Sequence, residues 1–287
     1  MAENLRTLRR KRETVGEIRQ ITRAMKLVSA AKLKRTQSWH AATASYFREV
    51  EDALSLVLAH AGPGFSHPLL DERAVERIVL LVVAGDKGLC GAFNSNVVSA
   101  ARAFLSGQRA RVQTLTVGTR TAEMARRARL NVTREFPALS ERQRGGDVQE
   151  IARYLFALWE AQACGEVHIC YSRFISRVRS LPVVERLLPA PVPEPADVVA
   201  PVILEPDARS LAATLLPQYV VASLFRAVLS SAVSEHAARL MAMSAATDNA
   251  QEMLKQLTRQ INRARQAEVT RELLDVVSGA DALQGPR

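Results

Sequence analysis

The chain has 287 residues, of which 48% are hydrophobic, and this composition is typical of a globular protein with one or two domains. Its net charge of +10 predicts an acidic partner, such as nucleic acid, an anionic membrane or a negative protein surface. No run approaches about eighteen uninterrupted apolar residues and the N-terminus is charged, so we expect neither a membrane-spanning helix nor a secretory signal. Three cysteines are too few for a disulfide framework, so we expect a reducing compartment.

The first predicted element is a long helix over residues 4–61, because this run has no Pro and a single Gly before Gly62-Pro63-Gly64 ends it. Four apolar residues of this helix are spaced by three, four and three, as in a coiled-coil seam: Ile18, Ile21, Met25 and Val28. We therefore expect residues 1–61 to form an N-terminal shaft helix that pairs with another long helix.

Positive charge is concentrated at the start of this helix. The first 35 residues hold eleven Lys and Arg against three Glu, a net charge of +8. Such a run is often a solvated helix face, but its concentration on one end of one helix favours an acidic neighbour. The basic residues are Arg6, Arg9, Arg10, Lys11, Arg12, Arg19, Arg23, Lys26, Lys32, Lys34 and Arg35.

The pattern changes over residues 75–188, where strands and helices alternate. Residues 77–84 form a run of β-branched residues and leucine, typical of a strand buried on both faces. Alternation of this kind predicts a Rossmann-like α/β domain on a mainly parallel sheet. The further expected strands lie at residues 112–117, 131–136, 166–171 and 176–188, and the expected helices at 94–105, 119–129 and 147–163.

A glycine-rich turn, Gly85-x-x-Gly88-x-x-Gly91, follows the first of these strands, where nucleotide-binding folds place phosphate loops. It lacks the G-x-G start of a dinucleotide site and the Gly-Lys-Ser/Thr end of a P-loop. We therefore interpret it as a tight strand-to-helix turn and expect no cofactor.

Residues with catalytic or metal-binding patterns are also missing from the sequence. The five histidines are scattered, and there is no Cys-x-x-Cys, H-E-x-x-H or arguable Ser-His-Asp set, so we expect no catalytic residues and no metal. Cys164 and Cys170 could suggest a redox pair, but Cys170 lies in an apolar run and is better interpreted as a buried strand residue.

Residues 189–206 hold six of the twelve prolines and predict an extended connector. A short helix is expected at 209–215, where Pro217 kinks or restarts the chain, and a long helix then runs to a stop at Gly279. We take residues 209–287 together as a C-terminal shaft helix that forms an antiparallel coiled coil with 1–61. Its seam alternates spacings of three and four: Leu240, Met243, Thr247, Ala250, Leu254, Leu257, Ile261 and Ala264.

Four stretches of the sequence resemble the F-type ATP synthase gamma subunit, and the similarity covers the whole chain in the right order. They are I-T-R-A-M-K-L-V-S-A-A-K-L at 21–33, G-D-K-G-L-C-G-A-F-N at 85–94, A-M-S-A-A-T-D-N-A at 242–250, and V-T-R-E-L-L-D-V-V-S-G-A at 269–280. The family usually has Ser where this chain has Gly85 and Arg where it has Lys87. The light-regulated chloroplast members carry an extra dithiol segment that nothing here matches.

The resemblance implies a central rotor shaft. In this family the terminal helices form the shaft inside a ring of three alpha and three beta subunits, and the α/β insert sits at its foot with the epsilon subunit and the membrane c-ring. Rotation couples transmembrane ion flow to ATP synthesis or hydrolysis at the beta subunits, so the chain itself is expected to be non-catalytic. Without a presequence, it is expected on the cytoplasmic face of the bacterial plasma membrane, attached only through the complex.

The same resemblance implies partner-contact residues. By motif, Arg265, Gln266, Thr270 and Glu272 correspond to the stretch that meets a loop of the beta subunit, and Met25 lies on the facing N-terminal helix.

Two other classes of protein remain as alternatives at this point. A basic coiled-coil nucleic-acid-binding protein would use residues 6–35 as its phosphate-contacting face and would show steep salt dependence. A nucleotide-dependent enzyme would use the α/β insert. We expect no nucleic acid among the partners, because the first alternative leaves the insert without a role.

Overall fold

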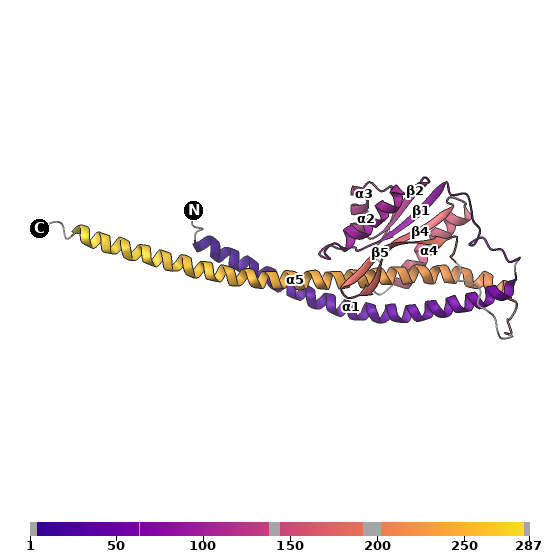
Figure 1. The fold of residues 1–287 in the computed structure, drawn as a ribbon, viewed down its shortest axis with the longest axis horizontal. Helices are drawn as coiled ribbons and strands as arrows, with labels where there is room; N and C mark the ends of the chain where they lie inside the picture. The colour runs from indigo at the N-terminus through magenta and orange to yellow at the C-terminus, as the bar shows by residue number, and fades with distance from the viewer. Residues whose placement is uncertain (1–4, 63, 138–143, 192–201, 284–287) are drawn as a thin grey trace. The chain divides into compact units, whose positions relative to one another are not determined.

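The structure is a computed structural model that describes residues 5–62, 64–137, 144–191 and 202–283. It is a mixed α/β protein with one five-stranded sheet and two very long helices (Figure 1). It divides into two compact units: a helical-pair unit, Met1–Val28 with Leu240–Arg287, and an α/β unit, Ser29–Arg239. The expected combination of a mainly parallel sheet with a long C-terminal helix is confirmed.

The two long helices are α1, Leu5–Ala61, and α5, Ala208–Leu283. α5 is continuous through Pro217, so the expected separate helix at 209–215 is wrong. A proline inside a helix costs about 3 kcal/mol, but the neighbouring Leu216, Tyr219 and Val220 are buried in the core of the α/β unit. The expected stop at Gly279 is also wrong, since α5 continues to Leu283. A glycine within a helix costs only about 1 kcal/mol.

The sheet has the strand order β3-β2-β1-β4-β5, and only β5 is antiparallel to its neighbour. The strands are β1 Arg77–Val83, β2 Arg111–Val117, β3 Val132–Phe136, β4 Glu166–Ser176 and β5 Arg179–Leu188. The helices between them are α2 Phe93–Ser106, α3 Thr119–Arg127 and α4 Arg144–Glu160. The chain therefore passes from β1 outward to β3 and returns on the other side of β1, as in a doubly wound fold.

Both faces of the sheet are covered, which explains the uninterrupted apolar run of β1. Leu81 and Val83 belong to a core formed with α4 and with residues of α1 and α5, whereas Leu80 and Val82 face α2 and α3. Cys164 lies in the first of these clusters and Cys170 in the second. The two thiols are therefore separated by the sheet, and both are free and buried.

Within the described residues, α5 is long and apolar enough, by length and composition alone, to cross a membrane, with a mean hydropathy of 1.4 over its apolar stretch. Of that stretch, 44% is buried within the protein. The buried Leu216, Leu224 and Val228 belong to the core of the α/β unit, and this packing accounts for the apolar composition of the helix.

The four-part division expected from the sequence stays a prediction. The structure divides the chain inside both long helices, after Val28 and before Leu240, because each helix contributes to both units. Most of the connector expected at 189–206 lies outside the described residues.

Candidate partner interface on the helical pair

The predicted seam of α5 is the face that α5 buries in the helical-pair unit. Met243, Ala250, Leu257 and Ile261 are buried, and the four seam residues between and beside them are half-buried. Leu257 and Ile261 form an apolar cluster with Leu8 of α1, against which Val15 and Ala264 pack. The alternating three-and-four spacing thus identified the right side of α5.

The seam expected on α1 is wrong. Ile18, Ile21 and Val28 are 47%, 59% and 56% exposed, whereas Leu8 and Thr22 are buried. Leu8 and Thr22 are two heptads apart, so this set has coiled-coil spacing as well. The more hydrophobic set, Ile18, Ile21 and Val28, is the one that does not face α5. A threonine fits the seam here because it meets another threonine: Thr247 Oγ1 lies 3.0 Å from Thr22 Oγ1.

The two helices of this unit run antiparallel. Arg19 Nη1 donates to Gln251 Oε1 at 2.6 Å, and three residues later along α1 Thr22 meets Thr247, four residues earlier along α5. With this register the first described residues of α1 lie beside Ala264, and α5 extends beyond the start of α1 (Figure 1). Every residue from 265 to 278 is exposed.

The five predicted partner-contact residues do not form one cluster. Arg265, Gln266, Thr270 and Glu272 all lie on the exposed end of α5. Thr270 Oγ1 donates to the Gln266 carbonyl at 2.9 Å. Met25 is half-buried on α1 and lies opposite about residue 244, roughly 20 residues or ~30 Å along α5 from Arg265.

Exposed apolar residues accompany these positions, and the sequence reasoning did not assign them to a partner. On α1, Ile18, Ile21 and Val28 lie beside Met25 on one flank of the helix. On the end of α5, the exposed apolar residues are Val269, Leu273, Leu274, Val276 and Val277. The spacing of these α1 residues is visible in the sequence, but spacing alone favours pairing with α5.

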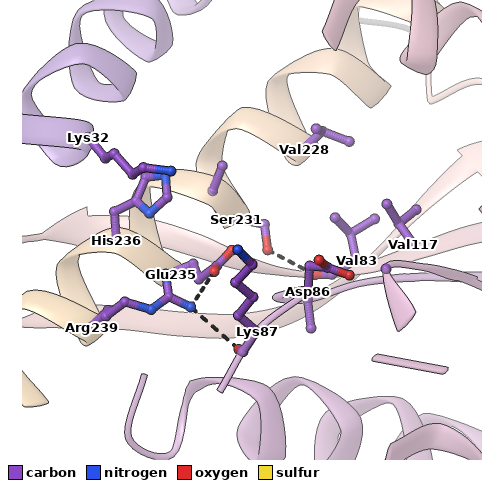
Figure 2. Close-up of a pocket in the computed structure, with 13 residues that line it drawn as sticks. Lys32, Val83, Asp86, Lys87, Val117, Val228, Ser231, Glu235, His236 and Arg239 are labelled. Atoms are coloured by element: carbon purple, nitrogen blue, oxygen red, sulfur yellow. Dashed lines mark hydrogen bonds and ion pairs between the residues drawn. The ribbon is translucent and has the colours of Figure 1, made fainter. Parts of the chain in front are cut away.

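The α/β unit contains a hollow of about 300 Å³ at the carboxyl ends of β1 and β2 (Figure 2). Charged side chains of both signs line it, among them Asp86, Lys87, Glu235 and Arg239. The Asp86 carboxylate accepts a hydrogen bond from the Thr119 N–H at the start of α3, at 3.1 Å. A helix N-terminus of this kind favours an anion, and here the chain supplies that anion itself.

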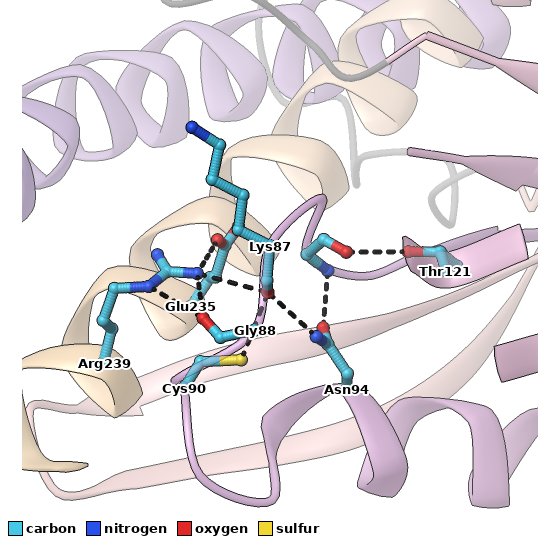
Figure 3. Close-up of polar contacts among 8 residues, drawn as sticks. Lys87, Gly88, Cys90, Asn94, Thr121, Glu235 and Arg239 are labelled. Carbon is cyan, nitrogen blue, oxygen red and sulfur yellow. Dashed lines mark hydrogen bonds and ion pairs between the residues drawn. The ribbon is translucent and has the colours of Figure 1, made fainter. Parts of the chain in front are cut away.

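Several polar groups of the glycine-rich turn after β1 form hydrogen bonds within the α/β unit (Figure 3). Asn94 Oδ1 accepts from the Gly85 N–H at 2.8 Å, and its Nδ2 donates to the Lys87 carbonyl at 3.2 Å. Arg239 of α5 donates to the Lys87 and Gly88 carbonyls and pairs with Glu235 at 2.6 Å. These contacts anchor the turn to α2 and α5, which favours the interpretation as a structural turn.

Comparison with known proteins agrees with this architecture. The ATP synthase family model matches residues 4–283. The ATP synthase gamma chains of Pelotomaculum thermopropionicum and Solibacter usitatus are 37% and 39% identical over 283 residues each. The two alignments cover 98% and 96% of this chain and 99% and 98% of the relatives.

Solved structures share the fold at lower identity. A chain of the Euglena gracilis mitochondrial ATP synthase has a TM-score of 0.65 at 17% identity, covering 97% of this chain and 94% of the other. A chain of the Tetrahymena thermophila central stalk and c-ring structure has a TM-score of 0.59 at 21% identity, covering 79% and 99%.

A chain that combines a pair of antiparallel helices with a doubly wound α/β unit belongs to the class of shaft proteins. The exposed end of α5, residues 265–278, has no partner among the described residues. The chain belongs to the ATP synthase gamma-chain family. Its function is that of the central-stalk subunit of ATP synthase, and this identity supports a non-catalytic subunit within that complex.

Proposed function

We propose that the chain rotates inside a ring of three alpha and three beta subunits and couples transmembrane ion flow to ATP synthesis or hydrolysis at the beta subunits. The observation that carries this proposal is the end of α5. Ala264 is the last seam residue of α5 that packs against the cluster with α1, and residues 265–278 are all exposed. A helix end of more than three turns, bearing both apolar and charged side chains, suits enclosure by other subunits.

Contacts with the beta subunit lie at two levels of the shaft in this proposal. Arg265, Gln266, Thr270 and Glu272 meet a beta loop at the end of α5, and Met25 meets beta about 30 Å away along the pair. The basic side chains of α1 face acidic beta segments, as exposed pairs that are individually worth about 1 kcal/mol or less. Weak pairs permit rotation because none of them fixes one register.

Stiffness is what such a shaft contributes. Shifting a two-state site from mostly one state to mostly the other takes about 5.5 kcal/mol of differential interaction. The apolar cluster of Leu8, Leu257 and Ile261 and the Arg19–Gln251 hydrogen bond hold α1 and α5 together in the helical-pair unit, the part that contacts the beta subunits in this proposal.

The α/β unit acts as a foot that meets the epsilon subunit and the c-ring, and the ATP chemistry belongs to the beta subunits. The hydrogen bonds that Asn94 and Arg239 make to the turn at Gly85 to Gly91, and the Asp86 carboxylate at the start of α3, support the absence of a nucleotide site in this chain. Because the relatives named above are bacterial gamma chains, our proposal assigns the chain to the cytoplasmic face of the plasma membrane, attached through the complex.

Co-purification tests this proposal. The tagged chain is isolated from detergent-solubilised membranes of its host, and mass spectrometry is expected to find alpha and beta subunits in threefold excess, together with epsilon and the c-ring. Recovery of nucleic acid in place of these subunits, with binding that weakens steeply as salt rises, would overturn the proposal in favour of a basic nucleic-acid-binding protein.

A further inference from the structure

The hairpin of β4 and β5 extends beyond the rest of the sheet. β1 pairs with β4 only as far as Cys170, and β4 continues for six more residues to Ser176. Beyond Cys170 only β5 pairs with β4 in the described chain, and the two strands are joined through Arg177 and Val178.

The projecting part of the hairpin is held firmly at its base. Ser230 Oγ of α5 accepts from the Phe174 N–H at 2.8 Å, and Ser234 Oγ donates to the Ser172 carbonyl at 3.2 Å. These two hydroxyls satisfy the edge of β4 that β1 no longer covers. The ring of His40, on α1, also lies edge-on to Phe174, with 6.1 Å between centroids.

The tip that this base supports is apolar and basic. Val178 is 78% exposed, Ile175 50% and Leu181 46%. Residues 167–184 contain no Asp or Glu, and their three arginines lie at or near the tip. Arg173 is paired with Glu185, but in the described part of the chain no ion pair is made by Arg177 or Arg179.

We infer that this hairpin tip, Arg173 to Leu181, is a docking element for an acidic, partly aliphatic segment of another subunit of the ATP synthase complex. The inference rests on the proposed function, because the partner is sought among the subunits of that complex. Charge complementarity identifies the partner as acidic, and the three exposed aliphatic side chains require apolar contact as well. A rigid base lowers the entropy lost when the tip binds.

An anionic membrane surface fits the tip less well. Two unpaired arginines near such a surface are worth about 1 kcal/mol each. The tip, residues 173–181, contains no Trp or Tyr, the side chains enriched at membrane interfaces. A protein surface can instead contact Ile175, Val178 and Leu181 together.

Photo-crosslinking in the intact complex tests the inference. A benzoylphenylalanine placed at Val178 is irradiated in the purified complex, and mass spectrometry is expected to find it joined to a peptide of another subunit that contains Asp or Glu. In the R177E/R179E background the crosslink yield is expected to fall at least fivefold. The matched charge reversal R102E/R153E, at exposed positions on α2 and α4, is expected to leave the yield unchanged.

Several results would overturn the inference. These are crosslinks only to this chain, to lipid or to peptides without acidic residues, or a yield that R177E/R179E does not change. In each of these cases the recovered alpha and beta subunits would leave the proposed function intact. A preparation lacking all other ATP synthase subunits would overturn both.

Discussion

The hydroxyl oxygens of Thr22 and Thr247 lie 3.0 Å apart where α1 and α5 face each other in the helical-pair unit. Each hydroxyl also lies near a backbone carbonyl of its own helix: Thr22 Oγ1 is 3.1 Å from the Arg19 carbonyl oxygen, and Thr247 Oγ1 is 2.7 Å from that of Met243. The two hydroxyl protons are therefore shared among three hydrogen-bonding contacts. If one threonine is replaced, the hydroxyl of the other still has the carbonyl of its own helix as a partner. A buried polar layer of this kind fixes the register of two helices more than it stabilises them.

Replacing both threonines by valine is therefore expected to change the free energy of unfolding by less than about 1 kcal/mol, because both polar partners are exchanged for apolar groups of similar shape. Guanidinium denaturation followed by circular dichroism measures this. Leu257→Ala is the positive control, with an expected loss of about 2 to 5 kcal/mol for a buried leucine. A loss above about 2 kcal/mol in T22V/T247V would show that the threonine pair is a main source of stability.

Charge reversal at Arg265 combined with truncation of Gln266 is expected to lower coupled ATP synthesis in reconstituted complexes. Loss of about 1 kcal/mol of contact with the beta subunit corresponds to roughly a fivefold effect. The variant R265E/Q266A should keep its helical circular dichroism, since both side chains are exposed. R259E/Q260A changes the same residue types six positions earlier, also at exposed sites, and is the matched control. Equal coupling in R265E/Q266A and wild type would remove the assigned contact.

Gly165→Ala is expected to destabilise the α/β unit by about 1 to 3 kcal/mol or more. A Cβ at this position would clash with the Ala74 carbonyl oxygen and lie 3.0 Å from the Val75 Cα, and both are backbone atoms that cannot rotate away. Gly16→Ala is the counterpart, because a Cβ there meets nothing within 4 Å inside α1. It should stabilise that helix by up to about 1 kcal/mol. Thermal denaturation distinguishes the two, and a Gly165→Ala protein as stable as wild type would contradict the prediction.

Burial raises the pKa of the Cys170 thiol from 9.0 to about 12. Because the folded pKa lies above the unfolded value, its contribution to stability is complete below about pH 9 and is lost as pH rises toward 12. The slope for one proton is at most about 1.4 kcal/mol per pH unit. Cys170→Ala should remove this component from a comparison of the free energy of unfolding at pH 8.5 and pH 10.5. An identical pH dependence in both proteins would show that the thiolate is not excluded by folding.

Much of this protein was determined by patterns along the chain. The run from Ile78 to Val83 is apolar at consecutive residues because both sheet faces are covered, and that pattern predicts a strand buried on both faces. The alternating spacing from Leu240 to Ala264 likewise identified the buried side of α5.

Only the tertiary structure decided which side of α1 faces its partner. Ile18, Ile21 and Val28 have the spacing of a seam, but Leu8 and Thr22 are the residues of α1 that contact α5. The choice between two regularly spaced faces of α1 depends on the side chains that α5 presents. The continuity of α5 through Pro217 was also settled by packing, since burial of Leu216 and Tyr219 outweighs a local penalty that sequence rules treat as a break. Local periodicity determines which residues share a face, and the partner surface determines which face is buried.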